Sequence, residues 1–382
     1  MTRALWKATA ARRRTLVAVF QRGAMDGLNV VPPFGDSHYY DLRPSIGIKP
    51  PSASDASSAL DLNGYFGLHP SLAPLKALYD AGEMAVVQAV GNPMADRSHF
   101  TAQQRMELAA AAQEHAPGGW LARHLNASAG TATAVVRAVS VGVAMDQSLA
   151  GAASAIAVPH SSDFRLTMAQ PELWRAQLAG AYSGAGAPLE QQSLDVFSVL
   201  DLFADAKPEG LPVDNGAQYP ADAFGDQMKQ AAQYIKADIG IEVICVDIGG
   251  WDTHAAETSA LPPVLQSFGG ALAAFRQDLG TRFDDVTVVT MSEFGRRAQE
   301  NAGGGTDHGH ANAMFVLGGG LRGGKVYTDW PTLADDHLDD GDLAVSTDYR
   351  TVLAGILSQR FGQQDLASVF PGWSGSRLGL FG

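Results

Sequence analysis

The sequence predicts an α/β protein with a mostly parallel central sheet and helices on both faces of that sheet. Two observations predict this class. Short apolar runs alternate with longer segments of helical periodicity along the 382 residues. The apolar runs are also uninterrupted, as expected for strands that are covered on both faces. A hydrophobic content of 46% supports a sizeable core.

Five apolar runs are expected to form the core strands. They are 15–20, 84–90, 241–248, 286–291 and 313–317. The clearest helix is expected at 264–279, because its apolar side chains recur every three or four positions and form one stripe. The same periodicity, less regular, predicts helices at 98–112 and 347–361.

The domain organisation follows from where this alternation holds. We expect an N-terminal tail at 1–14 and a single domain at 15–382. Within the domain, residues from about 125 to 225 are less regular and are broken by several glycines and prolines. We interpret this segment as an inserted lobe.

Composition excludes several classes of function. The net charge of -13 disfavours binding to nucleic acid or to anionic lipid. No apolar run approaches the ~18 residues of a membrane span. The single cysteine, Cys245, lies in an apolar run, so a disulfide framework is excluded and a core position is expected. The oligomeric state is not set by the sequence.

The N-terminus contains three consecutive arginines at 12–14, which loosely resemble a twin-arginine export signal. The apolar run behind them is LVAVF, which is shorter than the ~7–15 residues of a signal core. We therefore interpret LVAVF as a strand, and the chain as given has no complete signal peptide.

Polar side chains follow three of the expected strands where each strand ends. Asp26 follows the first, Asp252 and His254 follow the run at 241–248, and Glu293 follows the run at 286–291. In open α/β sheets, ligands bind at the carboxyl ends of the strands. The pattern therefore predicts a site at this edge.

His308 and His310 precede the strand at 313–317 instead of following one. They reach the same edge only if that strand is antiparallel to the others, or if their loop folds back. The sequence leaves both possibilities open.

The candidate ligands are carboxylates and imidazoles, in two pairs spaced i, i+2, and such pairs share one side of an extended segment. This donor set favours Zn²⁺ over Mn, Fe or Mg. The six residues are enough for one crowded ion or two open ones; they are Asp26, Asp252, His254, Glu293, His308 and His310. The alternative is that the aspartates are turn or cap residues and the histidines bond locally.

A candidate nucleophile follows the strand at 84–90. Ser98 stands where a helix is expected to begin, and the free N–H groups of a helix N-terminus suit an oxyanion. A metal would lower the pKa of its hydroxyl. Arg97 would fix an anion, and His99 would act as a ligand, a proton donor or a substrate contact. The alternative is simple capping by Ser98.

Several motifs resemble those of a known family. In chain order they are RGAMDGLNVV, GNPMADRSHF, DIGGWDTH, VTMSEFGRR, GGTDHGHANAMFVLGGG and STDYRTVLAGIL. This ordered set is similar to a large uncharacterised bacterial family of the alkaline-phosphatase superfamily, whose members are often exported by the twin-arginine route. The resemblance covers nearly the whole chain from about residue 15.

The resemblance implies an alkaline-phosphatase-like three-layer fold and a periplasmic or secreted protein. It implies metal ligands at Asp26, Asp252 and His254, a nucleophile at Ser98, and a last ligand at His308 or His310. Where the superfamily has an Asp-His pair, this chain has Glu293-Phe294, and a phenylalanine cannot bind a metal.

Three functions are compatible with these residues. The first is hydrolysis of a phosphate or sulfate ester, carried by a small molecule or a glycan, with Arg97 or Arg296 as a clamp. The second is a non-catalytic binding or secretion-associated protein, as the departure at Phe294 suggests. The third is metal-dependent hydrolysis of another bond.

Overall fold

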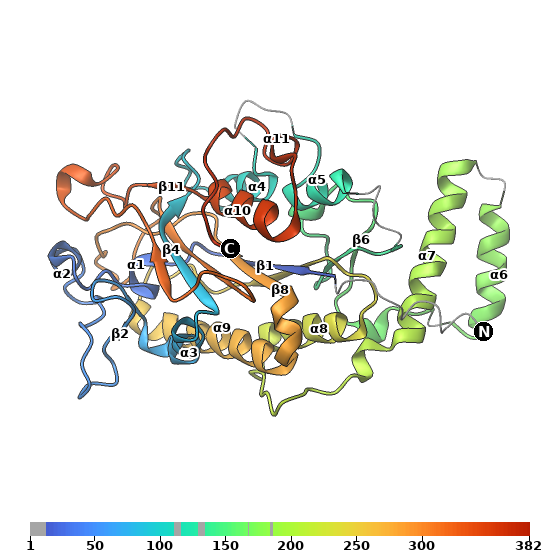
Figure 1. The fold of residues 1–382 in the computed structure, drawn as a ribbon, viewed down its shortest axis with the longest axis horizontal. Coiled ribbons are helices and arrows are strands. Elements are labelled where there is room, and N and C mark those ends of the chain that lie inside the picture. Colours follow the sequence, from blue (N-terminus) through green and yellow to red (C-terminus); the bar gives the residue numbers. More distant parts are fainter. Residues whose placement is uncertain (1–12, 111–115, 129–133, 167, 184–185) are drawn as a thin grey trace.

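The computed structural model describes residues 13–110, 116–128, 134–166, 168–183 and 186–382 (Figure 1). Most of the predicted N-terminal tail and the last two residues of the helix expected at 98–112 lie outside these ranges. The strands are β1 (Thr15–Gln21), β2 (Leu60–Asp61), β3 (Gly67–Leu68), β4 (Met84–Gly91), β5 (Ala138–Ser140), β6 (Ala155–Ala157), β7 (Val243–Ile248), β8 (Val286–Met291), β9 (Asn312–Gly318), β10 (Lys325–Tyr327) and β11 (Thr347–Asp348).

Helices account for much of the remaining chain. They are α1 (Gly27–Val30), α2 (Ser37–Leu42), α3 (Ala73–Asp80), α4 (His99–Leu108), α5 (Trp120–Ala127), α6 (Pro171–Tyr182), α7 (Ala187–Ala206), α8 (Ala223–Ala237), α9 (Glu257–Leu279), α10 (Tyr349–Phe361) and α11 (Leu366–Val369). The five expected core strands are present as β1, β4, β7, β8 and β9, so the alternation of strand and helix is confirmed.

In the described residues, the central sheet has the strand order β10-β4-β9-β8-β1-β7-β5-β6, with β11 beside β4. All pairings are parallel except those of β9, which is antiparallel to both β4 and β8. The amino end of β9 therefore lies at the edge where β1, β4, β7 and β8 end. This orientation resolves the question that the sequence left open for His308 and His310.

Helices cover both faces of the sheet (Figure 1). On one face, α3, α8 and α9 pack against inward-pointing residues such as Val17 and Val19 of β1. On the other face, α4, α5, α10 and α11 pack against Leu16 and Phe20 of the same strand. Successive side chains of a strand point to opposite faces, so a continuously apolar strand contributes to two cores. The predicted fold class is confirmed.

The segment expected as an inserted lobe is divided in two. Its first part contributes β5 and β6, which extend the sheet beyond β7. Its second part contains α6 and α7, which lie side by side at one end of the molecule and are joined by the Arg175–Asp201 ion pair (Figure 1). In the part of the chain that the structure describes, no helix is both long enough and apolar enough to cross a bilayer.

Candidate metal centre

Four side chains from three separate segments meet at the carboxyl edge of the sheet. His99 is the first residue of α4, Asp252 and His254 lie in the loop after β7, and His308 lies just before β9. The Nε2 atom of His308 is 3.0 Å from Nε2 of His99, 2.9 Å from Nε2 of His254 and 3.3 Å from Oδ1 of Asp252. Nε2 of His254 is 3.0 Å from the same Asp252 oxygen.

These separations suit a single metal ion. Donor atoms of His99, Asp252 and His308 all lie within 4.8 Å of one another. The separations among these three donors are 3.0, 3.3 and 3.6 Å. Nε2 of His254 is close to His308 and Asp252 but lies outside this group of three. A tetrahedral Zn²⁺ site with bonds of about 2.0–2.1 Å has donor-to-donor edges of about 3.3 Å. The residues therefore fit the metal that the donor types predicted.

The other ring nitrogen of each histidine contacts an oxygen acceptor. Nδ1 of His99 lies 2.8 Å from Oε1 of Glu293, and Nδ1 of His254 lies 3.2 Å from Oδ1 of Asp307. Nδ1 of His308 lies 2.9 Å from the backbone oxygen of Arg97. Since these oxygens accept hydrogen bonds, each neutral ring has its hydrogen on Nδ1 and a lone pair on Nε2. Histidines that bind a metal usually donate their other ring N–H to an oxygen acceptor in this way.

Close backbone contact holds the two ligand loops together. A Cβ atom at Gly305 would lie 2.4 Å from the backbone oxygen of Thr253, and one at Gly309 would lie 2.3 Å from the backbone carbon of Arg296. Real Cβ atoms do not come so near to backbone, so only glycine fits at these two positions. Gly305 therefore lets the loop of His308 lie directly against the loop of Asp252 and His254, and Gly309 lets it lie against the backbone of Arg296.

Arg296 is buried beneath these loops and is bonded to protein acceptors, so it is not exposed to a substrate. Its Nη2 atom donates to Oδ1 of Asp252 at 2.6 Å, and its Nε and Nη1 atoms donate to the backbone oxygens of Ala24 and Thr306. Burial opposes ionisation of Asp252, but the hydrogen bond and the charge of Arg296 outweigh it and lower the pKa of that carboxyl. Asp252 therefore stays ionised.

Glu293 and Phe294 surround the cluster without joining it directly. Oε1 of Glu293 accepts hydrogen bonds from the backbone N–H of Gly23 and from Gln103, besides its contact with His99. The ring of Phe294 lies 5.0 Å from that of His99 and 4.9 Å from that of His308. Phe294 thus forms an apolar wall of the site.

Besides Glu293, two of the six candidate ligands lie outside the cluster. Asp26 is buried, pairs with Arg43 at 2.6 Å, and caps α1 through the N–H of Leu28. His310 has both ring nitrogens engaged, Nδ1 with Asp339 at 2.9 Å and Nε2 with a backbone oxygen at 2.8 Å. Each has satisfied its polar atoms elsewhere, and neither is near enough to the other donors to be grouped with them among the described residues.

The Asp26–Arg43 pair belongs to a buried network that also contains Glu257. Burial opposes ionisation of Asp26, but the charge of Arg43 lowers the pKa of Asp26 overall. Burial, together with the negative charge of Asp26, raises the pKa of Glu257 to about 8. Oε1 of Glu257 accepts a hydrogen bond from Asn29 at 2.7 Å. Arg43 therefore supplies the positive charge that balances the charge of Asp26.

Ser98 precedes the first residue of α4 and is exposed. Its hydroxyl makes no capping bond to the helix and, among the described residues, accepts one 3.4 Å hydrogen bond, from Thr101. The guanidinium of Arg97 donates to Asp342 at 2.6 Å and to Asp340 at 3.2 Å. Simple capping therefore does not account for the Ser98 hydroxyl, and Arg97 is already paired with carboxylates.

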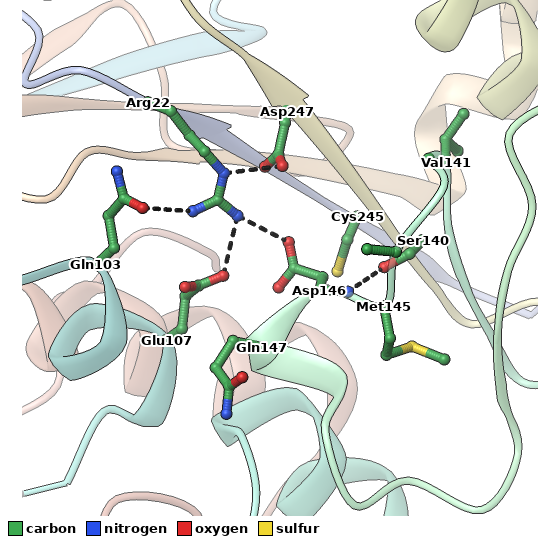
Figure 2. A pocket seen from close by; sticks show the side chains of 12 residues that line it. Arg22, Gln103, Glu107, Ser140, Val141, Met145, Asp146, Gln147, Cys245 and Asp247 are labelled. Atoms are coloured by element: carbon green, nitrogen blue, oxygen red, sulfur yellow. Dashed lines mark hydrogen bonds and ion pairs between the residues drawn. The ribbon is translucent and has the colours of Figure 1, made fainter. Parts of the chain in front are cut away.

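A pocket of about 300 Å³ is drawn in Figure 2, and it is linked to the cluster through one residue of its lining. Gln103 connects the two, because its Nε2 donates to Glu293 at 2.9 Å and its Oε1 accepts from Arg22 at 3.3 Å. The residues that line the pocket are Arg22, Gln103, Glu107, Ser140, Val141, Gly142, Ala144, Met145, Asp146, Gln147, Cys245 and Asp247.

Three carboxylates surround Arg22 in this pocket. Its guanidinium lies 2.8 Å from Asp247, 3.0 Å from Glu107 and 3.5 Å from Asp146 (Figure 2). Burial raises the pKa of Glu107 to about 7, and the charge of Asp146 adds to the increase. Because three acidic groups face one arginine, the pocket disfavours an anionic group on any molecule that enters it.

Sequence reasoning missed several residues that support the cluster. Gln103 stands four positions after His99, so it lies on the same face of α4, and this spacing was a usable signal. Asp307 is adjacent to a predicted ligand. Arg43 and Glu257 carry no local signal, since their partners are distant in the chain.

Residues 13–358 match the model of a protein family described as "Protein of unknown function (DUF1501)". The chain belongs to this family. Among solved structures, the DUF1501 protein is similar to the zinc complex of the C-terminal periplasmic domain of EcEptC from Escherichia coli. The two share 10% identity over 82% of this chain and 74% of that chain, with a TM-score of 0.36.

Two further structures are similar at the same level. The lipoteichoic acid synthase LtaP from Listeria monocytogenes has 8% identity and a TM-score of 0.37 over 88% of this chain and 75% of its own. The alkaline phosphatase from the Antarctic bacterium TAB5 has 9% identity and a TM-score of 0.34 over 83% of this chain and 95% of its own. These similarities are distant and say nothing about activity. No curated protein matches the DUF1501 chain.

Proposed function

We propose that this DUF1501 protein is a metal-dependent hydrolase of phosphate or sulfate esters. The observation that carries the proposal is that the Nε2 atoms of three histidines lie within 3.6 Å of a carboxylate oxygen of Asp252, each with its Nδ1 atom held by an oxygen acceptor. Asp252 and His308 would hold the ion, together with His99 or His254. When bound, the ion neutralises the anionic ester and lowers the pKa of a nearby hydroxyl.

The nucleophile of this proposal is Ser98, whose exposed hydroxyl makes no capping bond and adjoins the candidate ligand His99. The first N–H groups of α4 have no partner within the helix, so they supply donors and a favourable dipole for the transferred anionic group. The apolar ring of Phe294 excludes water from one side of the candidate ligands.

The acidic pocket linked to the cluster supports a preference in the alcohol part of the ester. Its charge favours a neutral or cationic leaving group over an anionic one. A small-molecule or glycan-linked ester with a single anionic group therefore fits the proposal better than a polyanion. Placement in the periplasm or outside the cell, implied by the family resemblance, remains part of the proposal.

Elemental analysis and kinetics test the proposal together. We expect about one metal ion per chain, and hydrolysis of simple aryl phosphates or sulfates in the presence of Zn²⁺, Mn²⁺ or Mg²⁺. The variant His308→Ala should lose both metal and activity, while His337→Ala, at an exposed histidine bonded to Pro331, should keep both. Wild-type protein that binds none of these ions would refute the proposal.

A further inference from the structure

Glu257 lies between the two loops that contain the candidate ligands. It is the first residue of α9 and only 1% exposed. Its Oε2 atom accepts a hydrogen bond from the hydroxyl of Thr253 at 3.2 Å and another from the hydroxyl of Thr306 at 3.2 Å. Thr253 stands between the two ligands of the loop after β7, and Thr306 stands two residues before His308. One carboxylate oxygen therefore bonds both ligand loops.

The second oxygen of Glu257 fixes the carboxylate to the body of the protein. Oε1 accepts from Nδ2 of Asn29 in α1 at 2.7 Å, and Oδ1 of Asn29 accepts from the hydroxyl of Tyr39 at 2.8 Å. Asn29 and Tyr39 are both buried. The carboxyl group that links the two loops, here called the tie, is therefore also hydrogen-bonded to the buried core.

A carboxyl group in this position is costly for the fold. Burying a carboxyl group beside Asp26 costs free energy that an apolar side chain of similar size would not. Both threonine hydroxyls are buried as well, at 3% and 0% exposure, so each needs an acceptor. Packing alone does not explain this arrangement, whereas a requirement to hold two loops in register does.

We infer that Glu257 is a positioning residue of the metal centre, which fixes the loop of Asp252 and His254 against the loop of His308. The inference rests on the metal centre proposed above. The donors of a tetrahedral ion must keep edges of about 3.3 Å, and these donors come from separate loops. Outer residues that orient ligands change metal affinity by about 10–100-fold.

The test compares Zn²⁺ dissociation constants, measured by competition with a chromophoric chelator, in full-length variants. Glu257→Ala should weaken Zn²⁺ binding by about 10–100-fold. Glu257→Gln should stay within about threefold of wild type, because its amide oxygen still accepts from Asn29 and its NH₂ group donates to the threonine hydroxyls. Rescue by glutamine but not by alanine is a result that a purely steric role would not give.

Matched controls distinguish the effect of the tie on Zn²⁺ affinity from a general loss of stability. Glu83→Ala removes another carboxylate bonded to α9, through Arg276 near the far end of the helix, and should leave Zn²⁺ affinity unchanged. Thr253→Val and Thr306→Val each remove one arm of the tie with little change of volume. Each should weaken Zn²⁺ binding, and the double variant should approach Glu257→Ala.

The outcomes are distinct. A folded Glu257→Ala protein with wild-type Zn²⁺ affinity overturns the inference and leaves the metal centre standing. If Glu257→Ala does not fold, the double threonine variant decides, and unchanged affinity there overturns the inference. Wild-type protein that binds no Zn²⁺ overturns the proposed metal centre itself.

Discussion

The Nε2 atoms of His254 and His308 lie 2.9 Å apart, although each ring contacts an oxygen acceptor through its Nδ1 atom. In the neutral rings both facing nitrogens then have lone pairs, which repel each other at this distance. A shared cation turns that repulsion into attraction. The relationship between these two residues is therefore the most direct reason to expect a metal ion, and it leads to the first prediction.

His308 and His310 should differ sharply in their effect on metal binding. His308→Ala removes the nitrogen that contacts both other histidines, so Zn²⁺ affinity should fall by more than about 100-fold, beyond the range of outer residues. His310→Gln should retain Zn²⁺, because His310 bonds to Asp339 and to a backbone oxygen instead. Equal losses in the two variants, measured by Zn²⁺ titration, would contradict this assignment.

Much of this site was predictable from the ends of strands, and the rest was not. The loops of Asp252, His254 and Glu293 were predictable because parallel strands end at one edge. The direction of β9 was not, since it depends on pairing with β4 and β8 across the sheet. That direction brings His308 to the edge.

Residues with distant partners were the least predictable. Asp26 follows its strand as expected, yet Arg43 satisfies its charge, and no local pattern indicates that pair. The helix α9 begins at Glu257 and not at 264, even though Pro262 and Pro263 lie inside it. A proline pair normally indicates a break, so nothing in the sequence extended the helix expected at 264–279 back to Glu257.

Gly305→Ala should weaken both the fold and the metal centre. The new Cβ atom would meet the backbone of Thr253 at 2.4 Å and of His254 at 2.5 Å, so the two ligand loops would have to separate. Overpacking of this kind costs about 1–3 kcal/mol in the free energy of unfolding. Denaturant unfolding and Zn²⁺ titration should show both losses.

Gly249→Ala is the matched control for that variant. Gly249 lies in the loop after β7, and a Cβ atom there would meet nothing within 4 Å. Its free energy of unfolding should stay within about 0.5 kcal/mol of wild type. A stable Gly305→Ala protein with full Zn²⁺ affinity would show that the loops are not held by this contact.

The stability of the protein should depend on pH through Glu107. Burial and Asp146 raise the pKa of Glu107 to about 7 in the folded state, above its usual value of 4.5. The folded state then binds more protons than the unfolded state between these values, so stability falls as pH rises from about 4.5 through 7. The limiting slope for one group is about 1.4 kcal/mol per pH unit.

Urea unfolding of Glu107→Gln and wild type across this pH range measures the effect. The variant lacks the titration, so its stability relative to wild type should increase as pH rises. Asp146→Asn should reduce the effect, because removing the charge of Asp146 lowers the pKa of Glu107. A stability difference that is flat between pH 4.5 and 7 would contradict the prediction.

Ser98→Ala should abolish ester hydrolysis without affecting the fold or the metal. The hydroxyl makes no capping bond, so its loss should change the free energy of unfolding by less than about 0.5 kcal/mol. By comparison, Asp222→Ala removes a true cap, bonded to the N–H of Gly225 at 2.8 Å, and should cost about 1 kcal/mol. Zn²⁺ content should stay at the wild-type level while kcat falls by about a thousandfold or more. If kcat instead persists, a metal-activated water is the nucleophile, and the same centre then acts on its substrate without Ser98.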